Sequence, residues 1–479
     1  MTFLGARASR PLLLTPSSAI GGEIHEERAG EAVKKSARSA LGVIHFRVES
    51  HKGKSGAMAE GLKTGIRLSR AVRTQLEWQT VCLDELIAED HRARAVWAYV
   101  ESLDLSPLYE QVQSVAGEVG RPAIDPAILM TLWLYATLEG IGSARLLDRL
   151  CERDLAYRWI RGGVGVNYHT LADFRVEAGP VLDDLLSRSI AALVAADVVD
   201  LSCVAVDGVR VRAAAGSGSF RAKERLEELD RLAREKVALL RAEVESDPAA
   251  TTRRLQARRA SAAEDRLRRL EAAREAHALI EAQRMAEARS QRRKTPKKGK
   301  TVRASTTDPQ ARIMKMADGG FRPAYNVQVK TDVASGFMVG VAVSDRASDR
   351  GQLTPAMAEI KQRYDDTPQR VLADGGYDGK DDIERLHQDK IALFCPVSDA
   401  HNKSDGPGVR ALRERMATEE GMALYRKRFA TERPHADMRN RGLQRFVVRG
   451  KEKVKAVVLW FVHAHNFLRI QTLQPAAAA

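Results

Sequence analysis

A charged tract of helical character separates two β-rich parts of this chain, and it restricts the possible folds more than any other feature. The tract covers residues 221–289 and is rich in Ala, Glu, Arg and Leu. Asp247-Pro248 divides it into two arms, because proline disrupts a helix interior. Two antiparallel helices are the natural arrangement of two such arms, so a sheet formed by the flanking segments has to accommodate a helical hairpin between its strands. The leucines near helical spacing are Leu226, Leu229, Leu232, Leu239 and Leu240 in the first arm, and Leu255, Leu267, Leu270 and Leu279 in the second.

Short strand patterns lie on both sides of the tract. Residues 203–214 (CVAVDGVRVRAA) form one of them, with a polar break at Asp207-Gly208 where the strand is expected to end. Beyond residue 320, YNVQVKTD and FMVGVAVSD flank a turn at residues 333–336 and predict a β-hairpin. A helix (352–364), a strand ending at Asp374, a loop with a helix, a strand (391–397) and further helices follow. This order predicts an α/β fold with a mixed sheet and helices on its faces.

The segment from residue 75 to residue 200 has a helical pattern. Asp125-Pro126 predicts a helix start, since Asp caps free amides and Pro suits the first turn. Glycines then interrupt the apolar run, Ser143 is placed to cap a second helix, and a third helix is expected to begin near His169-Thr170. Short helices with glycine breaks suit a helix-turn-helix-like DNA-binding module. An ordinary helical bundle has the same periodicity, so the pattern leaves both alternatives open.

The composition of the 479 residues suits a folded protein with a polyanionic partner. A hydrophobic content of 44% permits a real core and excludes wholesale disorder. The formal net charge of +14 favours nucleic acid as the partner. Four widely separated cysteines lack the spacing of a zinc or redox motif and fit a reducing, cytoplasmic setting. No apolar stretch approaches the roughly 18 residues of a membrane span, and the one near the N-terminus is too short for a signal peptide.

These patterns divide the chain into five expected parts. Residues 1–70 are expected to be a poorly ordered extension, within which Met58 is an alternative initiator. Residues 71–200 form the expected helical domain, and 201–220 with 304–470 form the α/β domain. The hairpin insertion occupies 221–303 and includes a basic loop at 290–300, while 471–479 are expected to be a disordered tail.

Two acidic residues occupy the ends of apolar strand patterns. Asp207 follows Val204-Ala205-Val206, and Asp374 follows Val371-Leu372-Ala373. The carboxyl ends of neighbouring strands are where α/β sheets place their active sites. Carboxylates there suit Mg²⁺, and a pair of such ions can activate an attacking oxygen and stabilise a leaving one. Asp is also a common turn residue, so the pattern fits a purely structural role as well.

A more specific pattern lies near the C-terminal end of the chain. Tyr425, Arg428, Glu432 and Arg439 are separated by three, four and seven residues, which places them on one face of a helix. A carboxylate between two guanidinium groups suits a site that binds metal and phosphate together. A solvated helix with ion pairs four residues apart has the same spacing. Pro434 either kinks this helix or begins a new one whose first turn contains Glu432.

Together these motifs resemble those of the bacterial insertion-sequence transposases of the DDE type. One large group of them has the signature Tyr, two residues, Arg, three residues, Glu, six residues, then Lys or Arg, which residues 425–439 match. VAVDGVRVRA and VLADGGYDG resemble the segments that bear the first and second Asp of the family. STTDPQARIMKMADGGFRPAYNVQV resembles the stretch before its second strand. GRPAIDPAILMTLWLYATLEGIGSARLLDRLCE and YHTLADFR resemble its N-terminal helical domain, so the likeness covers about residues 75–470.

The resemblance implies a ribonuclease-H-like catalytic domain and a reaction. Asp207, Asp374 and Glu432 would be the catalytic, metal-binding triad, with Mg²⁺ or Mn²⁺ as cofactor. Water would hydrolyse a phosphodiester at the element end, and the freed 3′-hydroxyl would attack target DNA. Tyr425, Arg428 and Arg439 would position phosphates. The implied partners are double-stranded DNA, namely terminal inverted repeats and target, and further copies of the chain; no membrane is involved.

Two other functions fit the same residues. A nuclease of this fold would cleave without joining, and an inactive relative would only bind DNA. The basic excess is concentrated in residues 221–303, with 24 basic and 14 acidic residues, and in residues 425–455, with 11 and 3. Both segments are therefore expected DNA surfaces, although the hairpin could equally pair with a second protomer or brace the domain.

The remaining polar and aromatic residues that attract interest have ordinary interpretations. His463, His465 and Asn466 are expected to be solvated or hydrogen-bonded, and His435 and Asp437 to lie away from the site. Three acids near a helix start are expected to cap or flank it, and the large aromatic side chains are expected in the core. These acids are Asp378, Asp381 and Asp382, and the aromatic residues are Trp133, Tyr135, Trp159 and Trp460.

Overall fold

The computed structural model describes residues 82–114, 122–246, 250–290, 301–397 and 405–473. The expected N-terminal extension with Met58 lies outside the described residues, and so do most of the basic loop (291–300) and the last six residues of the chain. All four cysteines are described, and none of them forms a disulfide. Among the described residues, no helix is long and apolar enough to span a lipid bilayer.

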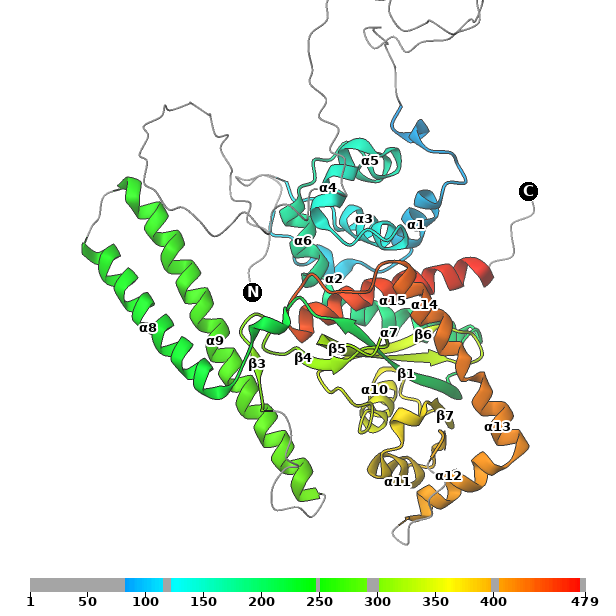
Figure 1. The fold of residues 1–479 in the computed structure, drawn as a ribbon. Helices are drawn as coiled ribbons and strands as arrows, with labels where there is room; N and C mark the ends of the chain where they lie inside the picture. Colours follow the sequence, from blue (N-terminus) through cyan, green and yellow to red (C-terminus); the bar gives the residue numbers. More distant parts are fainter. Residues whose placement is uncertain (1–81, 115–121, 247–249, 291–300, 398–404, 474–479) are drawn as a thin grey trace, which may run out of the picture. The chain divides into compact units, whose positions relative to one another are not determined.

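A six-stranded mixed sheet forms the centre of the α/β part (Figure 1). Strand β5 pairs antiparallel with β1 along one edge and with β4 and β6 along successive halves of the other edge. On the far side of β1, β7 and β8 continue the sheet in parallel. The predicted mixed sheet is confirmed. Its strands are β1 (Cys203–Arg212), β4 (Arg312–Lys315), β5 (Phe321–Asp332), β6 (Met338–Ser344), β7 (Arg370–Ala373) and β8 (Ala392–Phe394).

The predicted hairpin of β5 and β6 is also confirmed, and its turn explains the local sequence. The Asp332 carboxylate accepts a hydrogen bond from the Ser335 amide at 2.7 Å, which closes the turn. Gly336 then adopts a φ of +74°, a left-handed conformation that glycine reaches without a steric penalty. Turn chemistry and strand pattern therefore agree at this position.

Strand β1 does not end at Asp207, contrary to the expectation from its polar break. It continues to Arg212 because β5 pairs with it as far as Arg212↔Ala324. Only its parallel partner stops early, since β7 ends at Ala373. Asp207 thus lies within the antiparallel pairing of β1 with β5 and one residue beyond the parallel pairing of β1 with β7.

The described residues between 92 and 195 form seven helices, most of which begin at a capping side chain. The Asp125 carboxylate accepts from the Ala127 amide at 2.8 Å, and Ser143 caps the next helix, so both predicted starts are confirmed. The third predicted helix begins at Tyr168 with Asn167 as its cap, one residue before the expected position. The helices are α1 (Arg92–Glu101), α2 (Ser106–Tyr109), α3 (Pro126–Leu138), α4 (Ala144–Arg153), α5 (Leu155–Arg161), α6 (Tyr168–Glu177) and α7 (Gly179–Ala195).

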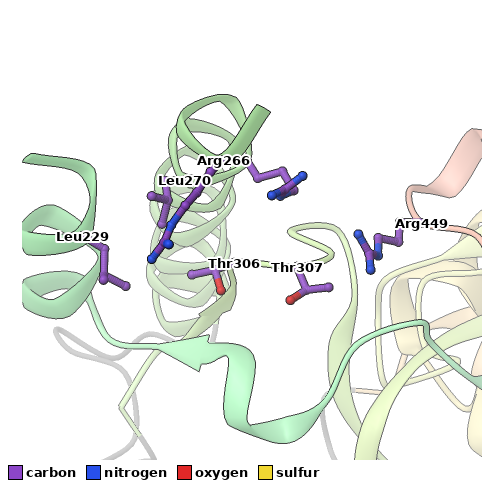
Figure 2. A pocket seen from close by; sticks show the side chains of 7 residues that line it. Leu229, Arg266, Leu270, Thr306, Thr307 and Arg449 are labelled. Carbon is purple, nitrogen blue, oxygen red and sulfur yellow. The ribbon is translucent and has the colours of Figure 1, made fainter. Parts of the chain in front are cut away.

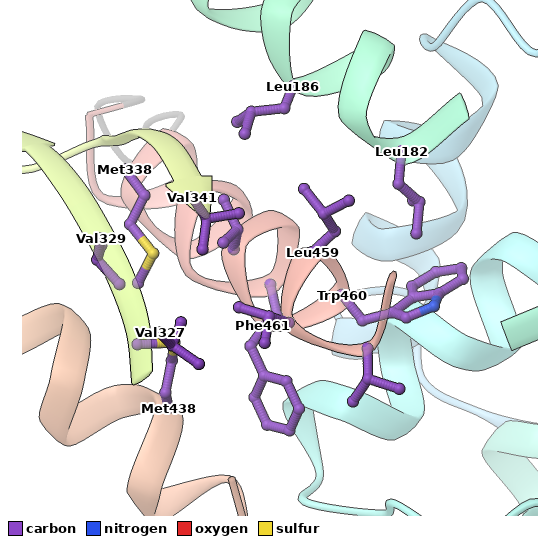
Figure 3. Close-up of a cluster of buried hydrophobic side chains, with 14 of the residues drawn as sticks. Leu182, Leu186, Val327, Val329, Met338, Val341, Met438, Leu459, Trp460 and Phe461 are labelled. Atoms are coloured by element: carbon purple, nitrogen blue, oxygen red, sulfur yellow. The ribbon is translucent and has the colours of Figure 1, made fainter. Parts of the chain in front are cut away.

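The apolar helix α15 (Lys451–Leu473) joins these helices to the sheet. It contacts α3, α6 and α7 as well as β6, so one hydrophobic core spans both parts (Figure 3). Trp460 is fully buried in this core, and its indole donates to the Arg175 carbonyl at 2.9 Å. Trp133 and Tyr135 are buried as predicted, while Trp159 is half-buried. The helix runs to Leu473, so residues 471–473, expected in the tail, are helical.

The tract that interrupts the sheet forms the two predicted helices, α8 (Lys223–Ser246) and α9 (Ala250–Ser290), which lie side by side (Figure 1). Arg234 pairs with Glu271 and Arg241 with Glu264, a register that runs in opposite directions along the two helices. The predicted antiparallel arrangement is therefore confirmed. A small cluster of Leu226, Ala273, Ala276 and Ala304 packs the base of the hairpin against the short strand pair β2 (Phe220–Arg221) and β3 (Ala304–Ser305).

A buried charge network fixes helix α10 (Leu353–Tyr364) to the sheet and to the helical part. The ammonium group of Lys330 on β5 is fully buried and pairs with Glu359 of α10. Glu359 also binds Arg363 at 3.0 Å, and Arg363 binds Asp183 of α7 at 2.5 Å. Lys455 of α15 completes the network at 2.6 Å from Asp183. Four elements are thus connected through alternating charges.

The remaining helices are short and follow β7 and β8. They are α11 (Lys380–Gln388), α12 (Pro407–Ala417), α13 (Glu419–Arg426), the 3₁₀ helix η4 (Lys427–Thr431) and α14 (Glu432–Asn440). Helix α12 packs on α11 and β8, and η4 contacts β1, β5 and β7. This last contact brings the C-terminal motif to the sheet.

Candidate functional site

The register of the two parallel strands places Asp207 beside Asp374. The last paired residues are Val206 and Ala373, and each is followed directly by an aspartate. Because side chains alternate along a strand, equivalent positions on paired strands face the same way. The two carboxylates predicted from strand ends are therefore neighbours on one face of the sheet.

Residues of η4 and α14 surround the Asp207 carboxylate. Oδ2 lies 3.3 Å from a guanidinium nitrogen of Arg428, and it accepts from the Thr431 hydroxyl at the same distance. The Nδ1 atom of His435 is 3.7 Å away. The other oxygen, Oδ1, accepts from the Gly208 amide at 2.8 Å. Tertiary contacts thus assemble this site from segments more than two hundred residues apart.

Burial and mutual repulsion both act on the two aspartates. Burial raises the pKa of Asp207, although the Gly208 amide, Arg428 and Thr431 oppose the rise. Burial likewise raises the pKa of Asp374, and the negative charges of Asp207 and Asp349 raise it further. Carboxylates that repel one another in a partly dry site gain stability from a bound cation.

Asp349 is a third acid at this position that the sequence analysis missed. Its side chain is mostly buried in the loop between β6 and α10 and accepts from Asn326 at 2.6 Å and from Gln328 at 2.9 Å. Arg210 lies 3.2 Å from its other oxygen. Unlike Asp207 and Asp374, Asp349 does not directly follow a strand pattern, since β6 ends at Ser344, and its place at the site depends on the path of the loop. The alternation of Asn326 and Gln328 along β5 was the available signal, since polar residues recur there within a buried strand.

Gly208 is the point of closest approach between β1 and the Asp349 cluster. A Cβ atom at this residue would lie 2.6 Å from both Asp349 Oδ1 and Gln328 Nε2. Replacing Gly208 by Ala would therefore displace two buried, hydrogen-bonded side chains. We expect the free energy of unfolding to fall by about 1–3 kcal/mol, measured by urea denaturation. Gly216→Ala is the matched control, since a Cβ there meets no atom within 4 Å; an equal loss in both variants would contradict the steric explanation.

The predicted single helix face of the C-terminal motif is not formed. Tyr425 belongs to α13, Arg428 to η4, and Glu432 and Arg439 to α14, so the 3₁₀ segment interrupts the helical periodicity. Pro434 lies in the first turn of α14, which confirms the second of the two alternatives considered for it. Tyr425 packs beside Cys203, Ala205, Leu372 and Phe394 rather than at the carboxylates.

Glu432 is the predicted triad member that the structure does not bring to the other two. It is exposed at the start of α14, directly after Thr431, which bonds to Asp207. Within the described part of the chain, no three His, Cys, Asp or Glu side chains gather closely enough to hold a metal ion. The backbone of Glu432 nevertheless lies one residue from a direct contact with the aspartate pair.

His435 lies against Asp207, contrary to the expectation that it lies away from the site. Burial, and then the positive charges of Arg439 and Arg428, lower the pKa of His435 to about 4. Its Nε2 atom is buried without a hydrogen-bond partner. Arg439 is itself exposed, and its positive charge acts on His435.

The other polar residues have the structural roles expected of them. His463 and His465 are buried and bond to the carbonyls of Leu182 and Gly336, at 2.8 and 3.0 Å. Asp437 binds His465 at 2.9 Å and does not contact the Asp207 carboxylate. Asn466 holds the backbone of Met338, Asp382 caps helix α10, and Asp378 pairs with Arg350.

The donor set is suited to a hard divalent cation. Carboxylate oxygens are the ligands that Mg²⁺ and Mn²⁺ prefer, and Asp207 and Asp374 present them on one face. Burial raises the pKa of both carboxylates, and a bound cation would offset the cost of their negative charges in this site. These two residues therefore fit a metal ion, and Glu432 and Asp349 are the nearby acids that could add a third carboxylate ligand.

Two comparisons with protein families give matches on different parts of the chain. A family model described as a transposase domain (DUF772) matches residues 60–177, which include most of the helical part. The model of the transposase DDE domain matches residues 264–467, which contain Asp374 and Glu432 but begin after Asp207. No curated protein and no solved structure matches the chain. A DDE domain implies a ribonuclease-H-like fold, and the mixed sheet agrees with that implication. Both models describe transposase domains, and together they support an insertion-sequence transposase of the DDE type.

Proposed function

We propose that this transposase cuts DNA at the ends of its element and joins the freed ends to target DNA, with Asp207, Asp374 and Glu432 as the metal-binding catalytic residues. The observation that carries the proposal is the pair of aspartates that directly follow the last paired residues of β1 and β7, together with the contact that Thr431, the residue before Glu432, makes with Asp207. Phosphate repels carboxylates, so an acidic site of this kind acts on DNA only with cations present.

The reaction takes place in two displacements at phosphorus. In the first, water forms a new P–O bond, the bond to the 3′-oxygen breaks, and a 3′-hydroxyl and a 5′-phosphate are left. In the second, that 3′-hydroxyl forms a bond to a target phosphorus and displaces the 3′-oxygen of the target strand. A bound Mg²⁺ or Mn²⁺ would lower the pKa of the attacking group and stabilise the leaving oxygen.

The side chains of the chain have distinct parts in this scheme. The guanidinium group of Arg428 lies beside the Asp207 carboxylate. When this carboxylate binds a cation, the guanidinium group can instead pair with a DNA phosphate. Arg439 contributes positive charge from α14, and Tyr425 is assigned to phosphate positioning from the signature spacing. His435 is neutral at pH 7 and limits the movement of Asp207 by its contact. DNA ends are brought together by more than one copy of the chain, in the bacterial cytoplasm.

A strand-transfer assay tests the proposal. The full chain is incubated with labelled duplex carrying an element end and with supercoiled target, in Mg²⁺, in Mn²⁺ or in EDTA. We expect joined product with either metal and a loss of at least about 100-fold in EDTA, since metal contributes several kcal/mol to the transition state. Cleavage without joined product would support a nuclease instead. Binding with neither cleavage nor joining would support an inactive DNA-binding protein.

A further inference from the structure

A pocket of about 350 Å³ lies where the helical hairpin meets the rest of the protein (Figure 2). Arg266 and Arg269 of α9 line it from the hairpin, and Arg449 lines it from the segment before α15. Thr306 and Thr307 line the pocket between the arginines of α9 and Arg449. None of these residues belongs to the aspartate site, and the volume is in the range of about 300–1,000 Å³ typical of ligand sites.

The charged side chains that line this pocket are all basic, and of these Arg449 also interacts electrostatically with the buried carboxylate of Asp308, which follows Thr307 in the chain. Three guanidinium groups line it, and no lining residue is acidic. Other arginines of the hairpin differ: Arg231 pairs with Glu235 at 2.7 Å, and Arg268 also pairs with a carboxylate of its own helix. Neighbouring positive charges repel each other unless an anion lies between them. The arrangement therefore favours an anionic ligand.

Hydrogen bonds fix the part of the pocket opposite the hairpin. The Ser305 hydroxyl accepts from the amides of Thr307 and Asp308, at 3.1 and 3.0 Å. The buried Asp308 carboxylate in turn accepts from the Tyr325 hydroxyl at 2.7 Å and from the Gly450 amide at 3.3 Å. These bonds hold Thr307 and Arg449 in place beside each other. Thr307 adds a hydroxyl to this basic pocket, whereas the Thr306 hydroxyl donates to the Ser219 carbonyl at 3.3 Å. The pocket is thus already assembled before a ligand arrives.

We infer that this pocket binds a backbone phosphate of DNA at a place separate from the aspartate site. Guanidinium groups grip phosphate oxygens bidentately, and threonine hydroxyls are common phosphate donors. A phosphate bound here contacts the hairpin and the core at once, so DNA binding fixes the angle of the hairpin. This inference rests on the proposed function for the identity of the polyanion, and it gives the hairpin a role in DNA binding rather than in bracing.

The test is DNA binding by the full chain in EDTA, measured with labelled duplex over a range of KCl concentrations. We expect R266A/R449A to weaken binding roughly tenfold or more, because charge-assisted bonds are lost. The slope of the logarithm of the DNA-binding constant against the logarithm of the KCl concentration should become shallower by about 0.9, which corresponds to one lost phosphate contact. R266K/R449K keeps the charges, so it should keep the slope while binding less tightly than wild type.

The matched control is R231A/R268A, which removes two exposed arginines of the hairpin that are paired with carboxylates. It should bind DNA within about twofold of wild type. Equal losses in both double variants, an unchanged constant and slope in R266A/R449A, or no DNA binding by wild type would each overturn the inference. The assay measures binding without catalysis, so its outcome is independent of the proposed cleavage reaction. Absence of phosphate binding at the pocket would not contradict DNA cleavage, and absence of cleavage would not affect the binding result.

Discussion

We expect that replacing Asp207 or Asp374 by Asn reduces DNA cleavage and joining by at least about 100-fold, because each change removes a carboxylate that we propose as a metal ligand. The amide has the same shape as the carboxylate, so the fold is preserved. DNA binding in EDTA should be unchanged or tighter, since one negative charge near the phosphates is lost. The measurement is single-turnover cleavage of end-containing duplex in Mg²⁺ alongside binding without metal.

A control variant separates the site from general effects of charge. Asp389→Asn changes an exposed carboxylate that pairs with Arg385 at the end of α11, and cleavage should stay within about twofold of wild type. Cleavage that survives both Asp207→Asn and Asp374→Asn would remove the aspartate pair from the mechanism. The proposed chemistry would then have to be abandoned for this site.

The third ligand is decided by comparing Glu432→Gln with Asp349→Asn. If Glu432 moves to the aspartates when metal and DNA bind, Glu432→Gln loses as much activity as Asp207→Asn. Asp349 is already engaged by Asn326, Gln328 and Arg210, so its replacement should cost about tenfold or less through displaced neighbours. The reverse order of effects would assign the third ligand to Asp349.

The largest effect on stability is expected at Glu359. Replacing it by Gln leaves the ammonium of Lys330 fully buried without its carboxylate, and breaking a buried ion pair in this way costs about 3–5 kcal/mol. Burial lowers the pKa of Lys330, and loss of its proton would limit the cost. The measurement is the free energy of unfolding of the full chain in urea, followed by circular dichroism.

Comparing Lys330→Met with Glu359→Gln tests whether an unpaired buried charge causes the loss of stability. It removes the buried charge itself, and Glu359 keeps Arg363 at 3.0 Å, so the loss should be below about 2 kcal/mol. Glu139→Gln, in an exposed pair with Arg92, should change stability by less than about 0.5 kcal/mol. A loss in Lys330→Met equal to that in Glu359→Gln would contradict the view that an unpaired buried charge is responsible.

Features set by a short stretch of sequence were predicted correctly. The Asp125 and Ser143 caps, the turn at Gly336 and the two helices of the insertion each depend on residues close together in the chain. Hydrogen bonds to nearby amides and helical periodicity act over only a few residues. The same kind of signal marked Asp207 and Asp374, because each follows an apolar strand pattern.

Features that depend on register between distant segments could not be predicted. The polar break at Asp207-Gly208 predicts a strand end, but β5 continues the pairing with β1 to Arg212. His435 lies against Asp207 only because η4 and α14 pack on the strand ends. Asp349 entered the site through a loop without any strand pattern.

The sequence by itself determined the family, the mixed sheet with its helical insertion and the concentration of positive charge in two segments. These features follow from local sequence patterns and from a motif of fixed spacing, and both can be recognised in the amino-acid sequence without the three-dimensional structure. The tertiary structure alone decided that Asp207 and Asp374 share a face, that Glu432 is exposed and that three arginines line one pocket. Such neighbours are brought together by packing of the whole core, because burial of apolar surface acts between segments irrespective of their separation along the chain.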